Sequence, residues 1–151
     1  LVSSPYDSSW LQEFNNNHAN FKTDELKNLE EQDLSGDEKY KQESLIYTPL
    51  YFTEDYLAKG ESILAKIQYD SLSLNSLYDD YMNDFDLKTD LGKLSKKTTI
   101  ISGNKDQIIH LEYMEKYKDI NFNFSFEILE GAGHFPFIEN NQGFINLITK
   151  L

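Results

Sequence analysis

Cysteine and arginine are both absent from the 151 residues, and each absence removes a class of function. Without cysteine, the chain can form neither a disulfide nor a thiolate metal site. All 14 basic residues are lysines, against 26 acidic residues, which gives a net charge of −12. This balance argues against nucleic-acid binding, which needs a basic surface, and against adhesion to anionic membranes. It favours solubility and, modestly, cationic substrates.

Long hydrophobic runs are also absent, since no stretch approaches the roughly 18 apolar residues of a membrane span. The hydrophobic fraction of 39% and the aromatic fraction of 14% suffice for a packed core. The three histidines, at positions 18, 110 and 134, lack metal-ligand spacing, and no glycine-rich phosphate loop follows a predicted strand. The sequence therefore predicts no cofactor, and it leaves the compartment open with the cytoplasm slightly favoured.

The stretch with the most chemical information is residues 131–134, Gly-Ala-Gly-His. Apolar and polar residues alternate before it, over residues 122–128, as expected of a β-strand, and a helical pattern follows it. The two glycines permit a tight turn, because glycine tolerates positive φ and close backbone approach. A strand, a small-residue turn and an exposed histidine before a helix are typical of a catalytic base in an α/β enzyme. The alternative is a structural histidine in an ordinary loop.

A second strand pattern, residues 98–101, ends in Ser-Gly and a polar loop that contains Asp106. Asp106 thus follows the end of one strand as His134 follows the end of another. Neighbouring strands of one sheet would bring the two side chains together. An acid that holds an imidazole in one tautomer is the orienting half of a Ser-His-Asp triad, here in the chain order Ser, Asp, His. The helix predicted after Asp106 carries on one face Ile108, Leu111, Met114 and Tyr117.

The segments TTIISGNKDQII and FEILEGAGHFPFIENNQGFINLITKL together resemble the C-terminal segment of the α/β-hydrolase fold. The resemblance covers roughly residues 91–151, and it implies that Asp106 is the triad acid and His134 the general base. The family's nucleophile motif, G-x-S-x-G, does not occur in the sequence. Because that motif precedes the triad acid in this family, we expect the nucleophilic serine to lie before Leu1. The chain is then the C-terminal portion of a longer enzyme, incomplete without an N-terminal half.

The remaining residues divide the predicted architecture into three parts. Residues 1–4 resemble the end of a core sheet strand. Residues 5–88 hold four or five helical patterns with no convincing strand, which predicts a helical cap over the active site. The clearest of these patterns predicts one amphipathic helix over residues 74–85. Residues 89–151 are predicted to form the last strands and helices of a mostly parallel sheet, so the fold class is α/β.

The cap supports a narrower resemblance. The segments LVSSPYDSSWLQEFN and LKNLEEQDLSGDEKYKQES resemble the cap of proline iminopeptidases, which remove N-terminal residues from small peptides. This resemblance implies that Glu30 recognises the free α-amino group of a substrate. The position before Glu30 departs from the pattern, because Leu29 stands where the family has histidine. The alternative interpretation of Glu30 is a solvated helix charge beside Glu31.

The predicted function is therefore a serine hydrolase that cleaves an amide or ester bond through an acyl-enzyme. The predicted substrate is a small molecule or a short peptide, and proline-iminopeptidase-like aminopeptidase activity is the narrower hypothesis. An esterase or lipase with a helical cap and a non-catalytic binding or interaction domain are the alternatives. By itself this segment is expected to be inactive, and to need the N-terminal half, a homo-oligomer or a domain swap. Glu139 is expected to interact with the dipole of the last helix.

Overall fold

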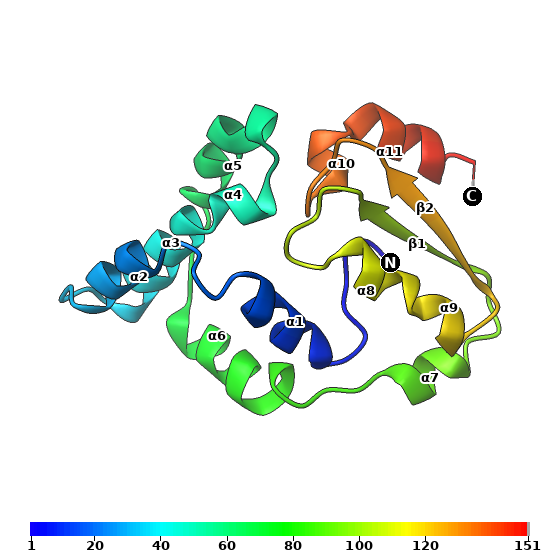
Figure 1. Cartoon of the computed structure of the whole chain (residues 1–151), viewed down its shortest axis with the longest axis horizontal. Coiled ribbons are helices and arrows are strands. Elements are labelled where there is room, and N and C mark those ends of the chain that lie inside the picture. The colour runs from blue at the N-terminus through cyan, green and yellow to red at the C-terminus, as the bar shows by residue number, and fades with distance from the viewer. Residues whose placement is uncertain (151) are drawn as a thin grey trace.

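The computed structural model describes residues 1–150, which form a helical part and a part with a small parallel sheet (Figure 1). The helical part lies to the left in the figure and the strands lie to the right. Its elements are α1 (Ser9–Asn17), α2 (Thr23–Glu30), α3 (Gly36–Ile46), α4 (Thr48–Tyr51), the 3-10 turn η1 (Glu54–Tyr56), α5 (Leu57–Leu64), α6 (Ser71–Leu77) and the π-helical turn η2 (Tyr78–Met82). Helix α7 (Lys88–Gly92) follows and lies on the right of the figure, beside the second part. The second part comprises β1 (Thr98–Gly103), α8 (Leu111–Glu115), α9 (Tyr117–Ile120), β2 (Phe124–Leu129), α10 (Pro136–Glu139) and α11 (Asn141–Ile148).

Strands β1 and β2 pair in parallel, from Thr98 opposite Phe124 to Gly103 opposite Leu129. The other edge of β1 is covered by the start of the chain, where Val2 forms a parallel bridge with Ile101. The crossover from β1 to β2 runs through α8 and α9, as parallel pairing requires. Both strands therefore end at the same edge of the sheet, and the loops that follow them lie together.

Strand β2 begins at Phe124, two residues later than the alternating pattern predicts. The reason is a turn held by Asn121, whose side-chain amide donates to the carbonyl oxygens of Leu91 and Leu94, both at 2.9 Å. Its Oδ1 accepts from the backbone N–H of Asn123. The alternation begins inside this turn, so Phe122 is 94% exposed instead of paired.

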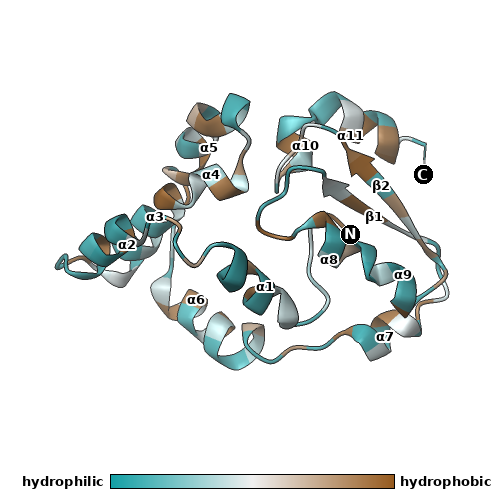
Figure 2. Cartoon of the chain, viewed as in Figure 1, coloured by the Kyte–Doolittle hydropathy of each residue, from teal (hydrophilic) through white to brown (hydrophobic). Residues whose placement is uncertain are grey.

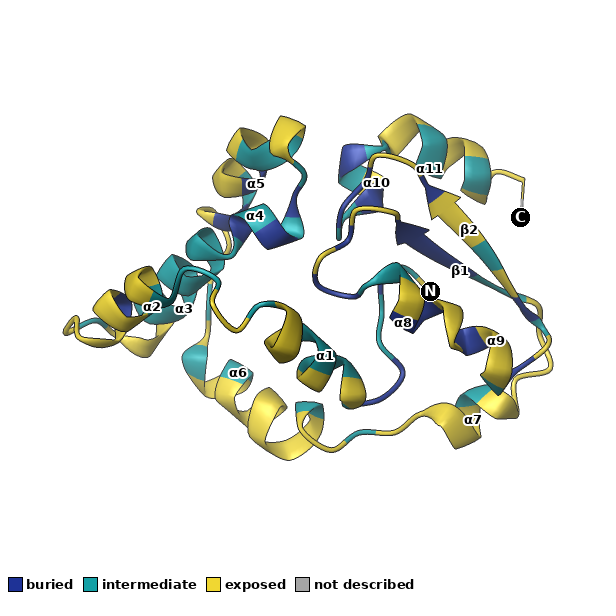
Figure 3. Ribbon diagram, viewed as in Figure 1, coloured by how far each residue is buried: buried dark blue, intermediate teal, exposed yellow. Residues whose placement is uncertain are grey.

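The main core packs against β1, where Ile100 is fully buried (Figure 3). Tyr6 stacks on Tyr113 with a centroid distance of 4.7 Å, and it meets Tyr117 edge-on at 4.8 Å. Helices α8 and α9 thereby cover β1 with their tyrosines and with Met114. The buried members of this cluster are Tyr6, Leu50, Ile100, Ile108, Ile109, Tyr113, Met114, Tyr117 and Phe124.

The start and the end of the helical part run side by side. Asp7 and Asp86 form an antiparallel bridge, and Ser8 donates to the carbonyl oxygen of Phe85 at 2.9 Å. The Tyr113 hydroxyl donates to the Asp7 carboxylate at 2.8 Å, which ties this bridge to the core. The division of the chain at residues 4 and 88 stays a prediction.

The long amphipathic helix predicted over residues 74–85 is not continuous. Helix α6 ends at Leu77 and the chain continues as the π-helical turn η2. This change alters the angular spacing of the side chains. Apolar and polar residues alternate along α6 (Figure 2). Much of the apolar stripe stays exposed, including Leu77 at 45% and Tyr81 at 64%. Among residues 1–150, no helix combines the length and the apolar character needed to cross a membrane.

Candidate active site

Asp106 lies in the loop after β1, and its carboxylate is held by the backbone. Oδ1 accepts from the N–H groups of Ile108 and Ile109, both at 2.9 Å. The Asp106 side chain has no exposed area. These bonds fix an Asx-type turn, so helix α8 begins only at Leu111. The prediction that Ile108 belongs to that helix is wrong, because Asp106 takes up the backbone donors there.

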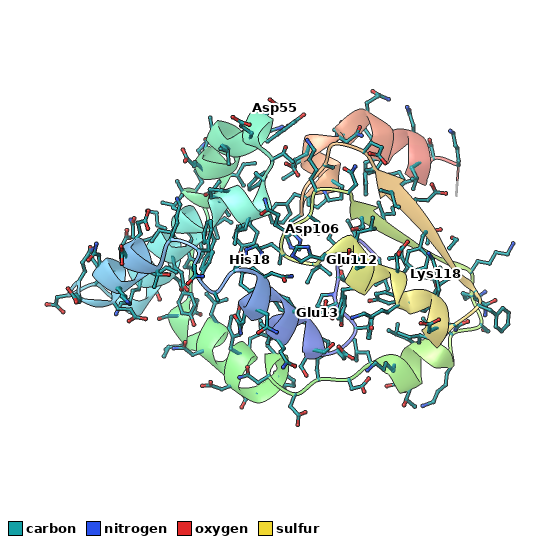
Figure 4. The ribbon with its side chains drawn as sticks, in the orientation of Figure 1. Glu13, His18, Asp55, Asp106, Glu112 and Lys118 are labelled. Carbon is teal, nitrogen blue, oxygen red and sulfur yellow. The ribbon has the colours of Figure 1, made fainter. Side chains whose placement is uncertain are left out.

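His134 lies in the loop after β2, and the structure brings it onto Asp106. Its Nδ1 lies 3.0 Å from Oδ2 and 3.2 Å from Oδ1 of Asp106. The His134 side chain is 17% exposed, and its backbone N–H donates to the carbonyl oxygen of Tyr51 at 3.1 Å. Figure 4 labels Asp106 between the helical part and the strands. The pairing follows from the parallel register, which ends both strands at one edge of the sheet.

Gly103, the last residue of β1, allows the histidine loop to approach the aspartate loop. A Cβ atom at this position would lie 2.2 Å from the carbonyl oxygen of Ala132 and 2.3 Å from that of Gly133. The close approach is fixed by a hydrogen bond from Lys105 N–H to the Ala132 carbonyl oxygen at 2.9 Å. Gly131 takes a φ of +76°, which lets the chain turn sharply after β2.

Glu139 is buried, with 6% exposure for the residue, and its carboxylate is bound by two separate segments. The expected interaction with a helix dipole stays a prediction. Oε2 accepts from the N–H of Gly133 at 2.5 Å. Oε1 accepts from the N–H and the hydroxyl of Thr53, at 2.7 and 2.9 Å. One carboxylate therefore joins the residue before His134 to the helical part of the chain.

Aromatic rings surround the imidazole. The His134 ring centroid lies 5.0 Å from that of Phe135 and 5.8 Å from that of Tyr51. Burial raises the pKa of the Tyr51 hydroxyl, so that hydroxyl stays protonated at neutral pH. The Asp106 carboxylate fixes the proton of His134 on Nδ1 and leaves Nε2 as the basic nitrogen. The arrangement can therefore accept and return a proton at Nε2.

A cavity of about 680 Å³ lies between α1, α3, α6 and the segments near α4. Tyr51 and Ile108 belong to its wall, and both are tied to the Asp106–His134 pair. The cavity is lined largely by aromatic rings, and its charged lining residues are Lys39 and Glu43.

Glu30 is the last residue of α2, where it is exposed and is not part of the cavity wall. Its backbone carbonyl oxygen accepts from Lys39 Nζ at 3.2 Å. The role predicted for its carboxylate stays a prediction. No group of three or more His, Asp or Glu side chains within residues 1–150 is arranged to hold a metal ion.

Several residues around the pair escaped sequence reasoning. Glu139 follows His134 by five positions, so its closeness to the histidine loop could be expected. Its burial could not, because it depends on Thr53 in a distant segment. Tyr51 lies in α4 beside His134, and Glu43 lies in α3 on the cavity wall, and the helical patterns did not indicate either position. Only the docking of the helical part on the histidine loop identifies them.

Comparison of the sequence with protein-family models gives no match, and comparison with curated proteins gives none either. Solved structures do match. An alpha/beta fold family hydrolase from Bacillus anthracis aligns with 99% of this chain and 56% of its own length, at a TM-score of 0.72 and 15% identity. The alpha/beta hydrolase enzyme MGS-M2, from a Medee basin deep-sea metagenome library, aligns with 97% of this chain and 52% of its own length, at a TM-score of 0.63 and 16% identity. An esterase from Exiguobacterium antarcticum aligns with 84% of this chain and 47% of its own length, at a TM-score of 0.62 and 21% identity.

This is the α/β-hydrolase fold. The predicted α/β architecture, helices followed by the last strands and helices of a parallel sheet, is confirmed. The chain spans about half the length of the hydrolase structures that it matches. At these identities the likeness establishes the fold, and the chemistry has to be argued from the residues.

Proposed function

We propose that this chain supplies the acid and the base of a hydrolase that cleaves an ester or amide bond through an acyl-enzyme. The observation that carries the proposal is the contact of 3.0 Å between His134 Nδ1 and the buried Asp106 carboxylate. The proposed nucleophile is a serine outside these 151 residues. Other proteins of this fold include the esterase from Exiguobacterium antarcticum, which supports an ester substrate.

In the proposed reaction, the serine hydroxyl attacks the substrate carbonyl carbon while His134 Nε2 takes its proton. The C–O or C–N bond then breaks, and Nε2 returns the proton to the leaving alcohol or amine. A water molecule repeats the attack on the acyl-enzyme, which releases the acid and the free serine. The fully buried Asp106 side chain orients His134 and stabilises the imidazolium that forms.

Between ester and amide substrates, one observation favours esters. The hypothesis of a proline-iminopeptidase-like aminopeptidase depends on Glu30, and Glu30 is exposed and outside the cavity wall beside His134. Aminopeptidase activity is therefore the second candidate. Hydrolysis of p-nitrophenyl esters and of proline p-nitroanilide by the full-length protein separates the two, and Glu30→Gln should alter only the second activity.

The test of the proposal is made on the full-length protein with a fluorophosphonate serine probe and intact mass. We expect one adduct on the wild-type protein. In both His134→Ala and Asp106→Asn, we expect kcat to fall by about 10³ to 10⁴. Asp55→Asn is the control, because Asp55 is an exposed aspartate on the helical part (Figure 4). The absence of both adduct and activity would favour the non-catalytic alternative, and activity retained within about tenfold in His134→Ala would refute the assigned base.

A further inference from the structure

The cavity beside the Asp106–His134 pair has an unusual lining. Tyrosine rings enter it from α3, from the segment around α4, from the loop before α6 and from η2, and the five are Tyr40, Tyr47, Tyr51, Tyr69 and Tyr78. Two of their hydroxyls are engaged with neighbouring wall residues. Tyr40 donates to Asn75 Oδ1 at 2.5 Å, and Tyr69 shares a hydrogen bond of 2.5 Å with Ser44. These bonds hold the two rings as fixed parts of the wall.

Glu43 places one carboxylate among these rings. Burial and the nearby Glu30 raise the pKa of Glu43, and within residues 1–150 no hydrogen bond or lysine offsets these effects. Burial, together with the nearby Glu43 carboxylate, raises the pKa of Tyr47, Tyr51 and Tyr78. All three tyrosines line the same cavity as Glu43. Glu43 thus places a half-buried carboxyl group on the wall of an aromatic cavity.

Lys39 is the other charged residue of the wall, one helical turn before Glu43. Its ammonium group donates to the backbone carbonyl oxygen of Glu30 at 3.2 Å, so it is directed toward α2. No ion pair between Lys39 and Glu43 is formed in the described part of the chain. The acidic group that the cavity offers to a ligand is therefore the Glu43 carboxyl group.

The cavity shares wall residues with the surroundings of the Asp106–His134 pair. Tyr51 forms part of its wall, and the Tyr51 ring centroid lies 5.8 Å from that of His134. Ile108, on the same wall, donates its N–H to the Asp106 carboxylate. Tyr51 and Ile108 therefore connect the cavity wall to the proposed catalytic pair.

We propose that this cavity binds an alkylammonium group, with Glu43 as its counter-ion and the tyrosine rings as its packing surface. A cation gains from both components, since aromatic rings attract positive charge and a half-buried carboxylate gains a partner. A neutral group of the same shape would leave Glu43 desolvated and unpaired. Binding of the cation does not depend on the proposed function. The assignment of the alkylammonium group to the substrate does rest on it, and it makes the substrate class an ester or amide that carries such a group.

The experiment compares choline with 3,3-dimethylbutan-1-ol, a neutral molecule of the same shape, by ligand-observed NMR titration of the full-length protein. We expect choline to bind at least about tenfold more tightly. Glu43→Gln should abolish this preference, whereas Glu61→Gln, a change at an exposed glutamate of α5, should keep it. Equal binding of the two ligands, or a preference that survives Glu43→Gln in a folded variant, would overturn the proposal.

Two further measurements separate this proposal from the proposed hydrolysis. The titration is repeated on His134→Ala, in which binding of choline should persist although catalysis should not. Preference for choline without any serine adduct would support the cation site and refute the proposed hydrolase. Ester or amide hydrolysis without a preference for choline would support the hydrolase and refute the cation site. Butylammonium is titrated alongside, because tighter binding than choline would assign the site to a hydrogen-bonded amine and weaker binding to a quaternary group.

Discussion

The carboxylate of Glu139 provides the sharpest test of how the histidine loop is held. It accepts three hydrogen bonds, one from Gly133 N–H at 2.5 Å and two from Thr53 at 2.7 and 2.9 Å. Glu139→Gln keeps the size of the side chain and one carbonyl oxygen. If that oxygen stays with Thr53, the amide NH₂ faces the Gly133 N–H, and two donors meet in a buried place. The residue before His134 then loses its acceptor.

The expected cost follows from that geometry. A hydrogen bond to a charged group contributes about 1.5–3 kcal/mol, and a buried N–H without an acceptor is penalised by a similar amount. We therefore expect the free energy of unfolding of the full-length protein to fall by about 2–3 kcal/mol in Glu139→Gln. Urea denaturation followed by circular dichroism measures this change. Glu127→Gln is the matched control, because Glu127 is an exposed glutamate of β2.

A double-mutant cycle tests whether Thr53 is the partner of Glu139. Thr53→Val removes only the hydroxyl that donates to Glu139 Oε1, and we expect it to couple to Glu139→Gln by about 1 kcal/mol, as groups in one network do. The explanation fails if Glu139→Gln lies within about 0.5 kcal/mol of Glu127→Gln, the range of ordinary surface substitutions. Additive effects of the two changes would show that Thr53 and Glu139 act independently.

Two further predictions concern Asp7, at the start of the helical part, and Gly103, where the histidine loop approaches the aspartate loop. Hydrogen bonds from Lys88, Ser9 and Tyr113 outweigh burial and lower the pKa of Asp7 to about 2. Because this pKa lies below the unfolded value, ionised Asp7 stabilises the fold above about pH 4. Roughly 2 kcal/mol of this stabilisation is lost as the pH falls from 4 to 2. Urea denaturation over this range should show that the free energy of unfolding depends less on pH in Asp7→Asn than in the wild-type protein. Gly103→Ala should lower the free energy of unfolding by at least about 2 kcal/mol, because its Cβ would lie 2.2 Å from a backbone oxygen. Gly92→Ala, whose Cβ would meet nothing nearer than 3.7 Å, should be harmless, and equal thermal stability of the two variants would contradict the account of Gly103.

Local residue patterns predicted the strands and the residues after them. Strand β1 begins where the β-branched run indicated and continues to Gly103. Strand β2 ends one residue later than predicted and begins two residues later, because the side chain of Asn121 holds a turn. Asp106 and His134 could be paired in advance, because each follows a strand and parallel strands end at one edge. The contact itself confirms their proximity, while their catalytic role stays a prediction.

Contacts between distant segments could not be predicted in this way. The exposed apolar stripe of α6 and η2 looked like a buried helix face, since periodicity reports only that a face exists and not what covers it. The burial of Glu139 depends on Thr53, which lies 86 positions away in the sequence. The sequence patterns did not distinguish Glu43 from other helix glutamates, and the packing of α3 against the neighbouring helices places it on the cavity wall.

The sequence by itself determined the α/β class, the two strand ends and the aspartate and histidine that follow them. It could do so because backbone periodicity and turn chemistry act over a few neighbouring residues. The tertiary structure alone decided which carboxylates are buried, which tyrosines surround the cavity and how the helical part docks on His134. These properties depend on desolvation and hydrogen bonding between segments that only the folded chain brings together.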